Sequence, residues 1–577
     1  MMNWGIFKPC LTANDFGTKK CVKMDNRPWL ATYPSGVPAN VDVEQYDNLI
    51  QFIEECFSKF KSQPAFQCMG KTMTFKDIDK YSERIAAYLQ SRGLKKGDKV
   101  AIMMPNLLQY PIAIFGVLRA GMIAVNTNPL YTPREMKHQF NDSNVKAIII
   151  ADNFAANLEK IIDETQIEII ITTSIGEMLG AIKGKMVDMV VKNVKGMVPK
   201  FNLVNTVSFK DALKQGGKFK ITPYESSPDD VILHQYTGGT TGVSKGAMLT
   251  NRNMVANMLQ MSAWMAKYLD FENEVTLSPL PMYHIFAFSA NCLAMMRLGS
   301  LTVLVTNPRD LGSIVKEFKR NKITLVTGVN TLFNALNNHK PFTELDFSSL
   351  KATVAGGMAV QLSVAEKWEE VTGCRISEGY GMTESSPVVS VNPLDKTARL
   401  GTIGQPVPST DVRIVNDQLE ALPFGEVGEL QVKGPQVMKG YYNKPRETAE
   451  TIIDGWLCTG DMATMDKDGF MKIVDRKKEM ILVSGFNVYP NEIEDVLSRH
   501  PKVLEVGAIG VPDAKSGEVV KVYIVKKDKS LKEKEVIEYA RENLTGYKVP
   551  KQVAFIDELP KTNVGKVLRR KLKEMEK

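Results

Sequence analysis

The sequence predicts an α/β protein in which a large N-terminal part precedes a small α+β domain. Up to Gly404, apolar strand-like runs alternate with amphipathic helical segments, which is typical of parallel sheets covered by helices. Beyond Gly404, short β-type segments separated by Pro and Gly turns indicate a β-rich subdomain. A charged hexad, Asp475–Met480, then leads into a last stretch that again alternates helix and strand.

Hydrophobic spacing places the elements of the large part. Helical periodicity predicts three helices, over residues 48–62, 74–89 and 111–120. Apolar runs predict three buried strands, over residues 100–104, 145–151 and 167–172. Thr250 is a suitable N-cap for a helix over 251–264. Strands over 323–327 and 352–355 end at glycines, and open α/β sheets bind ligands at such ends.

Residues 178–200 have a different character. Apolar residues recur there at helical spacing with lysines between them: Ile182, Met186, Val190, Val194 and Met197, with Lys183, Lys185, Lys192 and Lys195. A basic amphipathic helix of this kind can lie on an anionic bilayer surface. The alternative is a surface helix that docks its apolar side on the domain, and the sequence leaves both open.

The predicted domain boundaries follow from these changes of pattern. We expect a disordered extension over 1–26, a large domain over 27–474, a linker over 475–480 and a small domain over 481–577. Within the small domain, elements are expected over residues 491–497, 503–511, 519–526 and 531–544.

Composition excludes several classes of function. The chain has 577 residues, of which 44% are hydrophobic and 24% charged, as in ordinary globular proteins. A net charge of +8 is mild for this length and does not indicate nucleic acid. The seven cysteines form no C-x-x-C pair and the five histidines are dispersed, which indicates a reducing compartment without a zinc site. Neither a spanning helix nor a signal peptide is predicted.

The stretch Tyr236–Gly246 (YTGGTTGVSKG) follows an apolar run, Val231–Tyr236, that reads as a buried strand. Glycines let backbone N–H groups point at an anion, hydroxyls add donors and Lys245 adds a positive charge. It is not a Walker A loop, because no Gly-Lys-Ser/Thr follows the right glycine. Gly242–Gly246 matches the G-x-S-x-G elbow of serine hydrolases, with Ser244 as nucleophile. The alternative without a binding role is a flexible Gly/Thr linker.

Five sequence motifs follow one another along the chain in the order known from one protein superfamily. They are the loop 236–246, the glycine-rich turn Glu378–Glu384 (EGYGMTE), Gly455–Asp461 (GWLCTGD), Asp475–Lys478 (DRKK) and Lys561–Lys566 (KTNVGK). Together they resemble the adenylate-forming superfamily of acyl-CoA synthetases, firefly luciferases and adenylation domains. Ser484–Glu494 and Gly328–Asn334 narrow the resemblance to bacterial long-chain fatty-acid–CoA ligases, from about residue 27 to the end.

The resemblance implies the adenylate-forming fold with a mobile C-terminal domain, and a two-step reaction. A fatty carboxylate would attack the α-phosphate of ATP, and the CoA thiol would then displace AMP, feeding fatty-acid degradation or lipid synthesis. Mg²⁺ is the expected cofactor, with ATP and CoA as co-substrates. The expected partners also include an anionic membrane, through residues 178–200, and a second copy of the chain, but no nucleic acid. The expected location is cytoplasmic or peripheral on the cytoplasmic face of the membrane.

The resemblance also implies roles for individual residues. The phosphate loop comprises Tyr236, Thr237, Gly238, Gly239, Thr240, Thr241, Gly242, Ser244 and Lys245. Glu384 and Thr237 would contact Mg²⁺, a hard cation that prefers oxygen ligands. The nucleotide would further be bound by Gly356, Gly357, Glu378, Gly379, Tyr380, Gly381, Thr383, Asp461 and Arg476. Lys478 holds the hinge position, and the CoA channel is assigned to Ser484, Gly485 and Phe486.

Lys566 is the expected catalytic cation for adenylation, since attack of a carboxylate on a phosphate brings negative charges together. The alternative is a solvated lysine in a basic tail. His284 matches an aromatic position near the acyl pocket, where it either gates the pocket or packs in the core. The expected acyl lining comprises Ile285, Phe286, Val329, Phe333 and Met358.

Three rival functions remain at this stage. The first is another acid substrate within the superfamily, such as an aryl acid, or a carrier protein as acceptor. The second is a serine hydrolase that uses Ser244. The third is a non-catalytic lipid-binding protein, which the many nucleotide-site residues disfavour.

Overall fold

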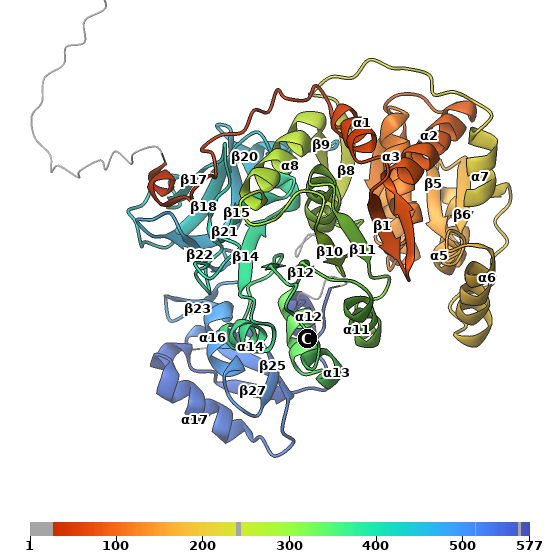
Figure 1. Cartoon of the computed structure of the whole chain (residues 1–577). Coiled ribbons are helices and arrows are strands. Elements are labelled where there is room, and N and C mark those ends of the chain that lie inside the picture. Colours follow the sequence, from red (N-terminus) through yellow and green to blue (C-terminus); the bar gives the residue numbers. More distant parts are fainter. Residues whose placement is uncertain (1–26, 238–243, 514, 563–566, 577) are drawn as a thin grey trace, which may run out of the picture.

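The computed structural model describes residues 27–237, 244–513, 515–562 and 567–576 (Figure 1). Within these ranges the chain forms four β-sheets, of nine, eight, five and five strands, with helices packed against them. The predicted α/β class is therefore confirmed. The predicted extension over 1–26 lies outside the described residues.

The nine-stranded sheet is parallel across its centre and antiparallel at both edges. Its order is β16 (Gln405–Pro406), β15 (Val388–Val391), β14 (Ile376–Gly381), β13 (Ala352–Ala355), β12 (Leu325–Gly328), β10 (Val275–Ser278), β11 (Leu301–Leu304), β1 (Pro64–Cys68) and β2 (Lys71–Thr74). The carboxyl ends of β12 and β13 lie side by side and carry Gly328 and, directly after β13, Gly356.

The eight-stranded sheet has the glycine loop near one edge. Its order is β19 (Gly440–Tyr441), β9 (Lys245–Thr250), β8 (Val231–Thr237), β4 (Ile123–Asn126), β3 (Lys99–Met103), β5 (Val145–Ala151), β6 (Ile169–Thr173) and β7 (Thr206–Ser208). The neighbouring strands in the run from β8 through β4, β3, β5 and β6 to β7 pair parallel, whereas β8 with β9 and β9 with β19 pair antiparallel. The loop thus joins two strands of a hairpin.

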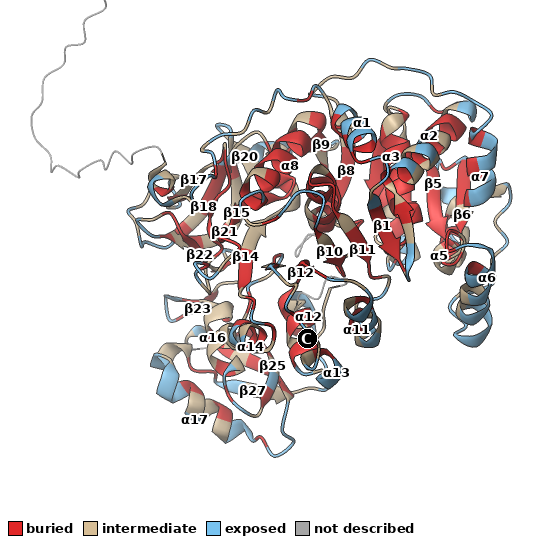
Figure 2. Ribbon diagram, in the orientation of Figure 1, coloured by how far each residue is buried: buried red, intermediate tan, exposed pale blue. Residues whose placement is uncertain are grey.

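Most helices bury an apolar side on these sheets and leave an outer side exposed, whereas the helices over 109–119 and 251–265 are buried on nearly all sides (Figure 2). The longer ones are α1 (Leu49–Lys59), α2 (Phe75–Ser91), α3 (Gln109–Arg119), α4 (Pro133–Ser143), α5 (Asp152–Glu159), α7 (Phe209–Gly216), α8 (Asn251–Met265), α11 (Leu311–Arg320), α12 (Asn330–Asn337) and α14 (Leu362–Thr372). Shorter ones are η1 (Pro28–Thr32), η2 (Ile162–Glu164), α9 (Ile285–Ala287), η4 (Phe288–Ala294), α10 (Met295–Arg297), α13 (Lys340–Thr343), η5 (Thr383–Ser385) and α15 (Pro445–Thr451). Thr250 caps α8 as predicted, because its side chain accepts a hydrogen bond from the backbone N–H of Asn253.

The β-rich part that was predicted beyond Gly404 is present, and most of it forms a five-stranded antiparallel sheet. Its strands are β17 (Asp411–Val415), β18 (Gly428–Lys433), β20 (Ile452–Ile453), β21 (Trp456–Met465) and β22 (Met471–Arg476). In Figure 1 the chain passes from β22 into the C-terminal part, drawn in blue.

The C-terminal part has its own sheet and its own apolar core. It contains β23 (Ile481–Val483), β24 (Phe486–Val488), α16 (Pro490–Ser498), β25 (Val503–Asp513), β26 (Gly517–Lys526), α17 (Glu533–Asn543), η6 (Gly546–Lys548), β27 (Gln552–Phe555) and α18 (Arg569–Glu574). The four predicted elements of this part all exist, with ends that differ by at most a few residues.

Two local predictions were wrong. Residues 378–381 of the predicted glycine-rich turn belong to strand β14, and the turn begins only at η5. Glycine serves there for close approach, since a Cβ on Gly381 would lie 2.0 Å from the carbonyl oxygen of Pro387. The single helix expected over 178–200 is shorter, comprising α6 (Ala181–Met189) and a π-helical turn, η3 (Val190–Val194).

Candidate functional site

The β8–β9 hairpin places Thr237 opposite Lys245, at the two ends of the glycine loop. Gly238, Gly239, Thr240, Thr241 and Gly242 lie outside the described residues. Tyr236 points its ring into the core, where its hydroxyl donates to Asp142 Oδ2 at 2.7 Å and accepts from Ser143 Oγ at 2.8 Å. The carbonyl of Ser244 lies 3.0 Å from His138 Nε2. Tyr236 thus anchors the end of strand β8 in the core.

Lys245 and Glu384 are brought together by a residue that no motif pointed to. The ammonium of Lys245 lies 4.1 Å from the ring centroid of Tyr441, and the Tyr441 hydroxyl donates to Glu384 Oε1 at 2.6 Å. Glu384 is buried in η5, which contacts both β8 and β9. Burial raises the pKa of Tyr441, and the adjacent Glu384 raises it further, so the phenol stays protonated and donates.

A second carboxylate is held in a similar way. The Tyr380 hydroxyl donates to Asp461 Oδ2 at 2.6 Å, and Arg476 Nε lies 3.1 Å from Asp461 Oδ1. Asp461 and Arg476 are direct neighbours across β21 and β22. Because Asp461 is only 4% exposed, the tyrosine and arginine provide the partners that a buried carboxylate needs.

The glycines after β13 adjoin the expected acyl pocket. A Cβ on Gly356 would lie 2.9 Å from the ring of Phe286, so the aromatic side chain occupies the space that glycine leaves. Gly357 adopts φ +82°, which favours glycine. Val329 is buried and Met358 partly buried against the main core, and Ile285 and Phe333 also belong to that core. His284 accepts from the N–H of Phe286 at the start of α9.

Glu378 has backbone partners within the fold. Its carboxylate accepts from Val360 N–H at 3.0 Å and from Gly401 N–H at 3.3 Å. Burial raises its pKa to about 7. Gly379 and Gly381 lie on the same strand, and Thr383 begins η5 beside Glu384. A nucleotide-binding role for Glu378 stays a prediction.

The predicted linker is tied to the C-terminal part through Arg569. Its guanidinium contacts Asp475 at 3.6 Å, Glu494 at 2.8 Å and Glu479. Asp475, fully buried, also accepts from Asn491 N–H at 2.8 Å. Burial lowers the pKa of Lys478, as do the charges of Arg476 and Lys245, so the predicted hinge lysine lies within electrostatic reach of the site.

The residues assigned to the CoA channel form an exposed turn between β23 and β24. Ser484 and Gly485 have φ +51° and +84°, and the ring of Phe486 stacks on Tyr547 with centroids 4.7 Å apart. Lys566 lies outside the described residues, so the structure does not place the expected catalytic lysine.

The residues around Glu384 fit a magnesium ion that is bound chiefly by phosphates. Among the described residues no group of three or more His, Cys, Asp or Glu could form a metal cage. Mg²⁺ commonly takes one or two carboxylates plus substrate phosphates and water. Glu384 on η5 and Thr237, at the start of the glycine loop, offer oxygen donors of that kind.

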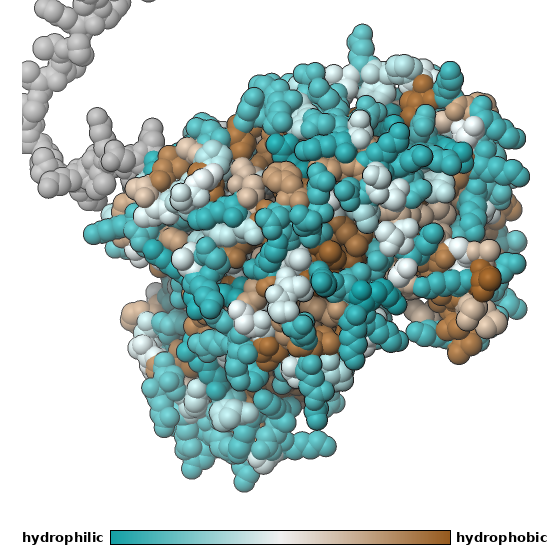
Figure 3. All heavy atoms as spheres, viewed as in Figure 1, coloured by the Kyte–Doolittle hydropathy of each residue, from teal (hydrophilic) through white to brown (hydrophobic). Residues whose placement is uncertain are grey.

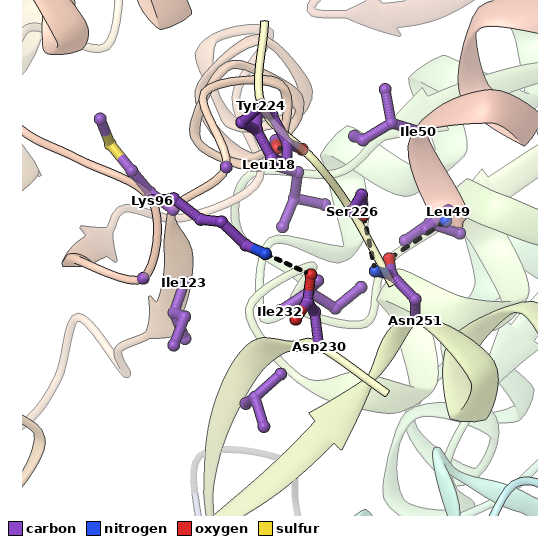
Figure 4. A pocket seen from close by; sticks show the side chains of 14 residues that line it. Leu49, Ile50, Lys96, Leu118, Ile123, Tyr224, Ser226, Asp230, Ile232 and Asn251 are labelled. Carbon is purple, nitrogen blue, oxygen red and sulfur yellow. Dashed lines mark hydrogen bonds and ion pairs between the residues drawn. The ribbon is translucent and has the colours of Figure 1, made fainter. Parts of the chain in front are cut away.

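A cavity of about 170 Å³ lies away from these residues, at the amino ends of β4 and β8 (Figure 4). Its lining includes Ile50, Leu118 and Ile123, and the ion pair Lys96–Asp230 at 2.7 Å crosses it. Its polar groups are paired with one another, so we assign it no part in the candidate site. Over the described ranges, no helix combines the length and apolarity needed to cross a membrane.

Comparisons with known proteins find family models and relatives that match this chain. Residues 53–442 match the model of the AMP-binding enzyme family, and residues 492–566 match that of the AMP-binding enzyme C-terminal domain. The chain is 54% identical over 547 residues to a long-chain-fatty-acid–CoA ligase of Escherichia coli O6:H1, covering 95% of this chain and 98% of that protein. It is 39% identical over 554 residues to a long-chain-fatty-acid–CoA ligase of Bacillus subtilis, with the same coverage.

Solved structures resemble the fold as a whole. The ATP-bound MatB of Rhodopseudomonas palustris superimposes with a TM-score of 0.79 at 26% identity, covering 92% of this chain and 99% of that one. The anthranilate CoA ligase AuaEII with anthranoyl-AMP gives 0.82 at 24% identity, covering 93% and 99%, a likeness of fold alone.

Proposed function

The chain belongs to the AMP-binding enzyme family, and from that membership we propose that it is a long-chain-fatty-acid–CoA ligase. It converts a fatty acid, ATP and CoA to acyl-CoA, AMP and diphosphate through an acyl-adenylate. The observation that carries the proposal is 54% identity along nearly the whole chain to ligases of that name. The arrangement of two buried carboxylates, Glu384 and Asp461, that each accept a tyrosine hydrogen bond is consistent with it.

The first half-reaction needs ATP to be held while a carboxylate approaches. The loop between Thr237 and Lys245 binds the β- and γ-phosphates, and Lys245 offsets charge as diphosphate leaves. Asp461 accepts from the ribose hydroxyls, and Tyr380 and Arg476 keep that carboxylate oriented. Glu384 and Thr237 would hold Mg²⁺, which would neutralise phosphate charge.

The acyl substrate lies among the apolar residues beside Gly356. Phe286, Val329 and Met358 offer apolar surface there, and His284 stands at the start of the same helix as Phe286. A related feruloyl-CoA synthase of an Amycolatopsis species is 33% identical over 504 residues, which makes an aryl acid the second candidate.

A diphosphate-release screen over carboxylic acids of graded length, with an aryl acid alongside, tests the substrate class. We expect activity with long-chain acids and little with the aryl acid. A reversed order would overturn the proposal. Replacing CoA by a holo carrier protein in the same assay tests the acceptor, and loss of thioester formation is expected.

The magnesium proposal has its own test. Glu384→Gln keeps the size and one oxygen of the side chain but removes the charge. We expect it to raise the Mg²⁺ concentration for half-maximal ATP binding by about 10–100-fold, as changes at metal sites commonly do. An unchanged magnesium titration would argue against ligation.

We also propose reversible contact with an anionic membrane through α6 and η3. One side of this segment docks on the protein, where Val187 and Val191 pack against the core and Asp188 accepts from Gly176 N–H. The other side is exposed, with Ile182 at 80% and Val194 at 73% of their accessible surface. Figure 3 shows apolar surface over α6 at the lower right edge. An exposed apolar side among lysines supports the proposal.

Vesicle flotation with and without phosphatidylserine tests this contact. Each basic residue near an anionic surface contributes about 1 kcal/mol, so charge reversal at Lys185, Lys192 and Lys195 should abolish flotation. Charge reversal at Lys534, exposed on α17, is the control. Equal flotation of both variants would show that α6 and η3 do not carry the contact with the membrane. Homodimer formation and a cytoplasmic location stay predictions, and sedimentation velocity at several concentrations tests the first.

A further inference from the structure

The segment Met438–Tyr442 lies between the two parts of the candidate phosphate site. On one side it pairs with β9, the strand that leaves the glycine loop, with Tyr441 opposite Ala247 and the Tyr442 N–H donating to the Gly246 carbonyl at 2.8 Å. On the other side its Met438 N–H donates to the backbone carbonyl of Glu384 at 2.8 Å. The segment therefore ties the strand of Lys245 to the turn of Glu384.

We propose that Tyr441 is a positioning residue that fixes the Lys245 ammonium and the Glu384 carboxylate in one arrangement before ATP binds. This inference rests on the proposed function, in which those two groups hold the phosphates and the metal. It assigns Tyr441 a role through its ring on one side and through its hydroxyl on the other.

The hydroxyl acts on Glu384. A carboxylate on a short 3-10 turn can rotate about its terminal torsions, and a hydrogen bond of 2.6 Å from Tyr441 to Oε1 restricts that rotation. The segment Met438–Tyr442 also holds the backbone carbonyl of Glu384, so the same segment fixes both the main chain and the side chain of this residue. Partners that orient a metal-binding group commonly change metal affinity by about 10–100-fold when they are removed.

The ring acts on Lys245. An aromatic face attracts an ammonium at 4.1 Å without neutralising its charge, whereas a carboxylate partner would compete with phosphate for it. Tyr441 therefore directs the lysine and leaves its full charge for an anion. The direct contact of one side chain with both groups distinguishes Tyr441 from an ordinary core tyrosine.

The position of Tyr441 is itself fixed. Its N–H donates to Thr448 Oγ1 at 2.9 Å, and Gly440 before it adopts φ +144° with Thr448 packed where a Cβ would lie. The next residue, Tyr442, points to the opposite side of the strand, where its ring lies 4.5 Å from His234. Tyr442 therefore offers a matched control for the loss of a tyrosine hydroxyl.

The test measures ATP binding without turnover, by calorimetric titration of ATP in the absence of Mg²⁺ and at a series of fixed Mg²⁺ concentrations, with no fatty acid present. Tyr441→Phe removes the hydroxyl and keeps the ring, whereas Tyr441→Leu removes both. We expect Tyr441→Phe to raise the Mg²⁺ concentration for half-maximal ATP binding about tenfold. The Kd for ATP without Mg²⁺ should change by less than twofold. Tyr441→Leu should also weaken ATP binding without Mg²⁺, by about 3–30-fold. Tyr442→Phe should leave both titrations unchanged.

Two reference variants separate this inference from the proposed function. If Glu384→Gln and Lys245→Met weaken Mg²⁺ and ATP binding while Tyr441→Phe behaves as Tyr442→Phe, the positioning role is overturned and the site assignment stands. If the reference variants also bind normally, both fail together. A double variant, Tyr441→Phe with Glu384→Gln, should need no higher Mg²⁺ concentration for half-maximal ATP binding than Glu384→Gln alone. Additive losses would show that Tyr441 does not act through Glu384.

Discussion

Replacing Arg569 by Met should destabilise the C-terminal part and its connection to the linker. The guanidinium is 13% exposed and lies among Asp475, Glu479 and Glu494, of which Asp475 is fully buried. Methionine keeps much of the volume and removes the charge. The three carboxylates would then remain close together without their common cation.

The magnitude follows from burial and from protonation. Removing one partner of a buried ion pair commonly costs about 3–5 kcal/mol. Burial already raises the pKa of Asp475 to about 6, so a carboxyl of the cluster can take up a proton and limit the loss. We therefore expect about 2–4 kcal/mol at pH 7.5. In the variant, loss of the Arg569 charge moves the folded-state pKa of Asp475 further above its unfolded value, so stability falls as pH rises, and the loss at pH 5.5 should be smaller.

Differential scanning calorimetry of the full chain at pH 5.5 and 7.5 measures the effect. For a domain of about 100 residues, 2–4 kcal/mol lowers the transition midpoint by about 10–30 °C. Arg570→Met is the control, because Arg570 is 58% exposed and pairs with Glu574 one turn away, an interaction of about 0.3–0.5 kcal/mol. An Arg569→Met transition that matches the control, or that does not respond to pH, would refute the reasoning.

Three further predictions concern other parts of the molecule. Glu378 titrates with a folded pKa of about 7 against an ordinary 4.5, so the wild type should lose stability between pH 4.5 and 7, by at most about 1.4 kcal/mol per unit; thermal melts of Glu378→Gln should lack that slope. Lys245→Ala should raise the KM for ATP more than the KM for fatty acid, and the reverse in steady-state kinetics would contradict its phosphate role. Lys566→Ala should block adenylate formation yet still convert supplied acyl-adenylate to acyl-CoA. Lys478→Pro and Gly485→Leu should do the opposite, since φ +84° at Gly485 disfavours a side chain. Equal slowing of both half-reactions would count against domain rotation.

The sequence predicted the elements well where local pattern determines them. The strand before the glycine loop, the Thr250 cap and the helices of the C-terminal part depend on hydrophobic spacing and capping, which are local. The glycine-rich turn at 378–381 was wrong because glycine there serves close strand approach, which only the partner strand reveals. Motif order predicted that Lys245 and Glu384 belong to one site, although Lys245 lies on strand β9 and Glu384 lies on the turn η5.

Residues that hold the motif residues in place were not predictable. Tyr441 belongs to no motif and reaches Lys245 only because β19 pairs with β9, which lies almost two hundred positions earlier in the chain. Arg569 was part of a basic tail in the sequence, and only the packing of α18 near the linker makes it a partner of three acids. Such contacts depend on long-range pairing, for which one sequence carries no local signal.

The two tyrosine–carboxylate pairs also explain how the site can exist before its ligands arrive. Glu384 and Asp461 are both nearly buried, and a buried carboxylate without a donor would be costly or protonated. A tyrosine hydroxyl supplies one strong hydrogen bond to each and, being neutral, leaves the negative charge in place. Positive charge stands next to each pair. Arg476 contacts Asp461 directly, whereas Lys245 lies over the ring of Tyr441, whose hydroxyl binds Glu384. Because these partners come from the protein itself, ligand binding need not reorganise them, and in the proposed reaction such preorganisation would favour the charged transition state.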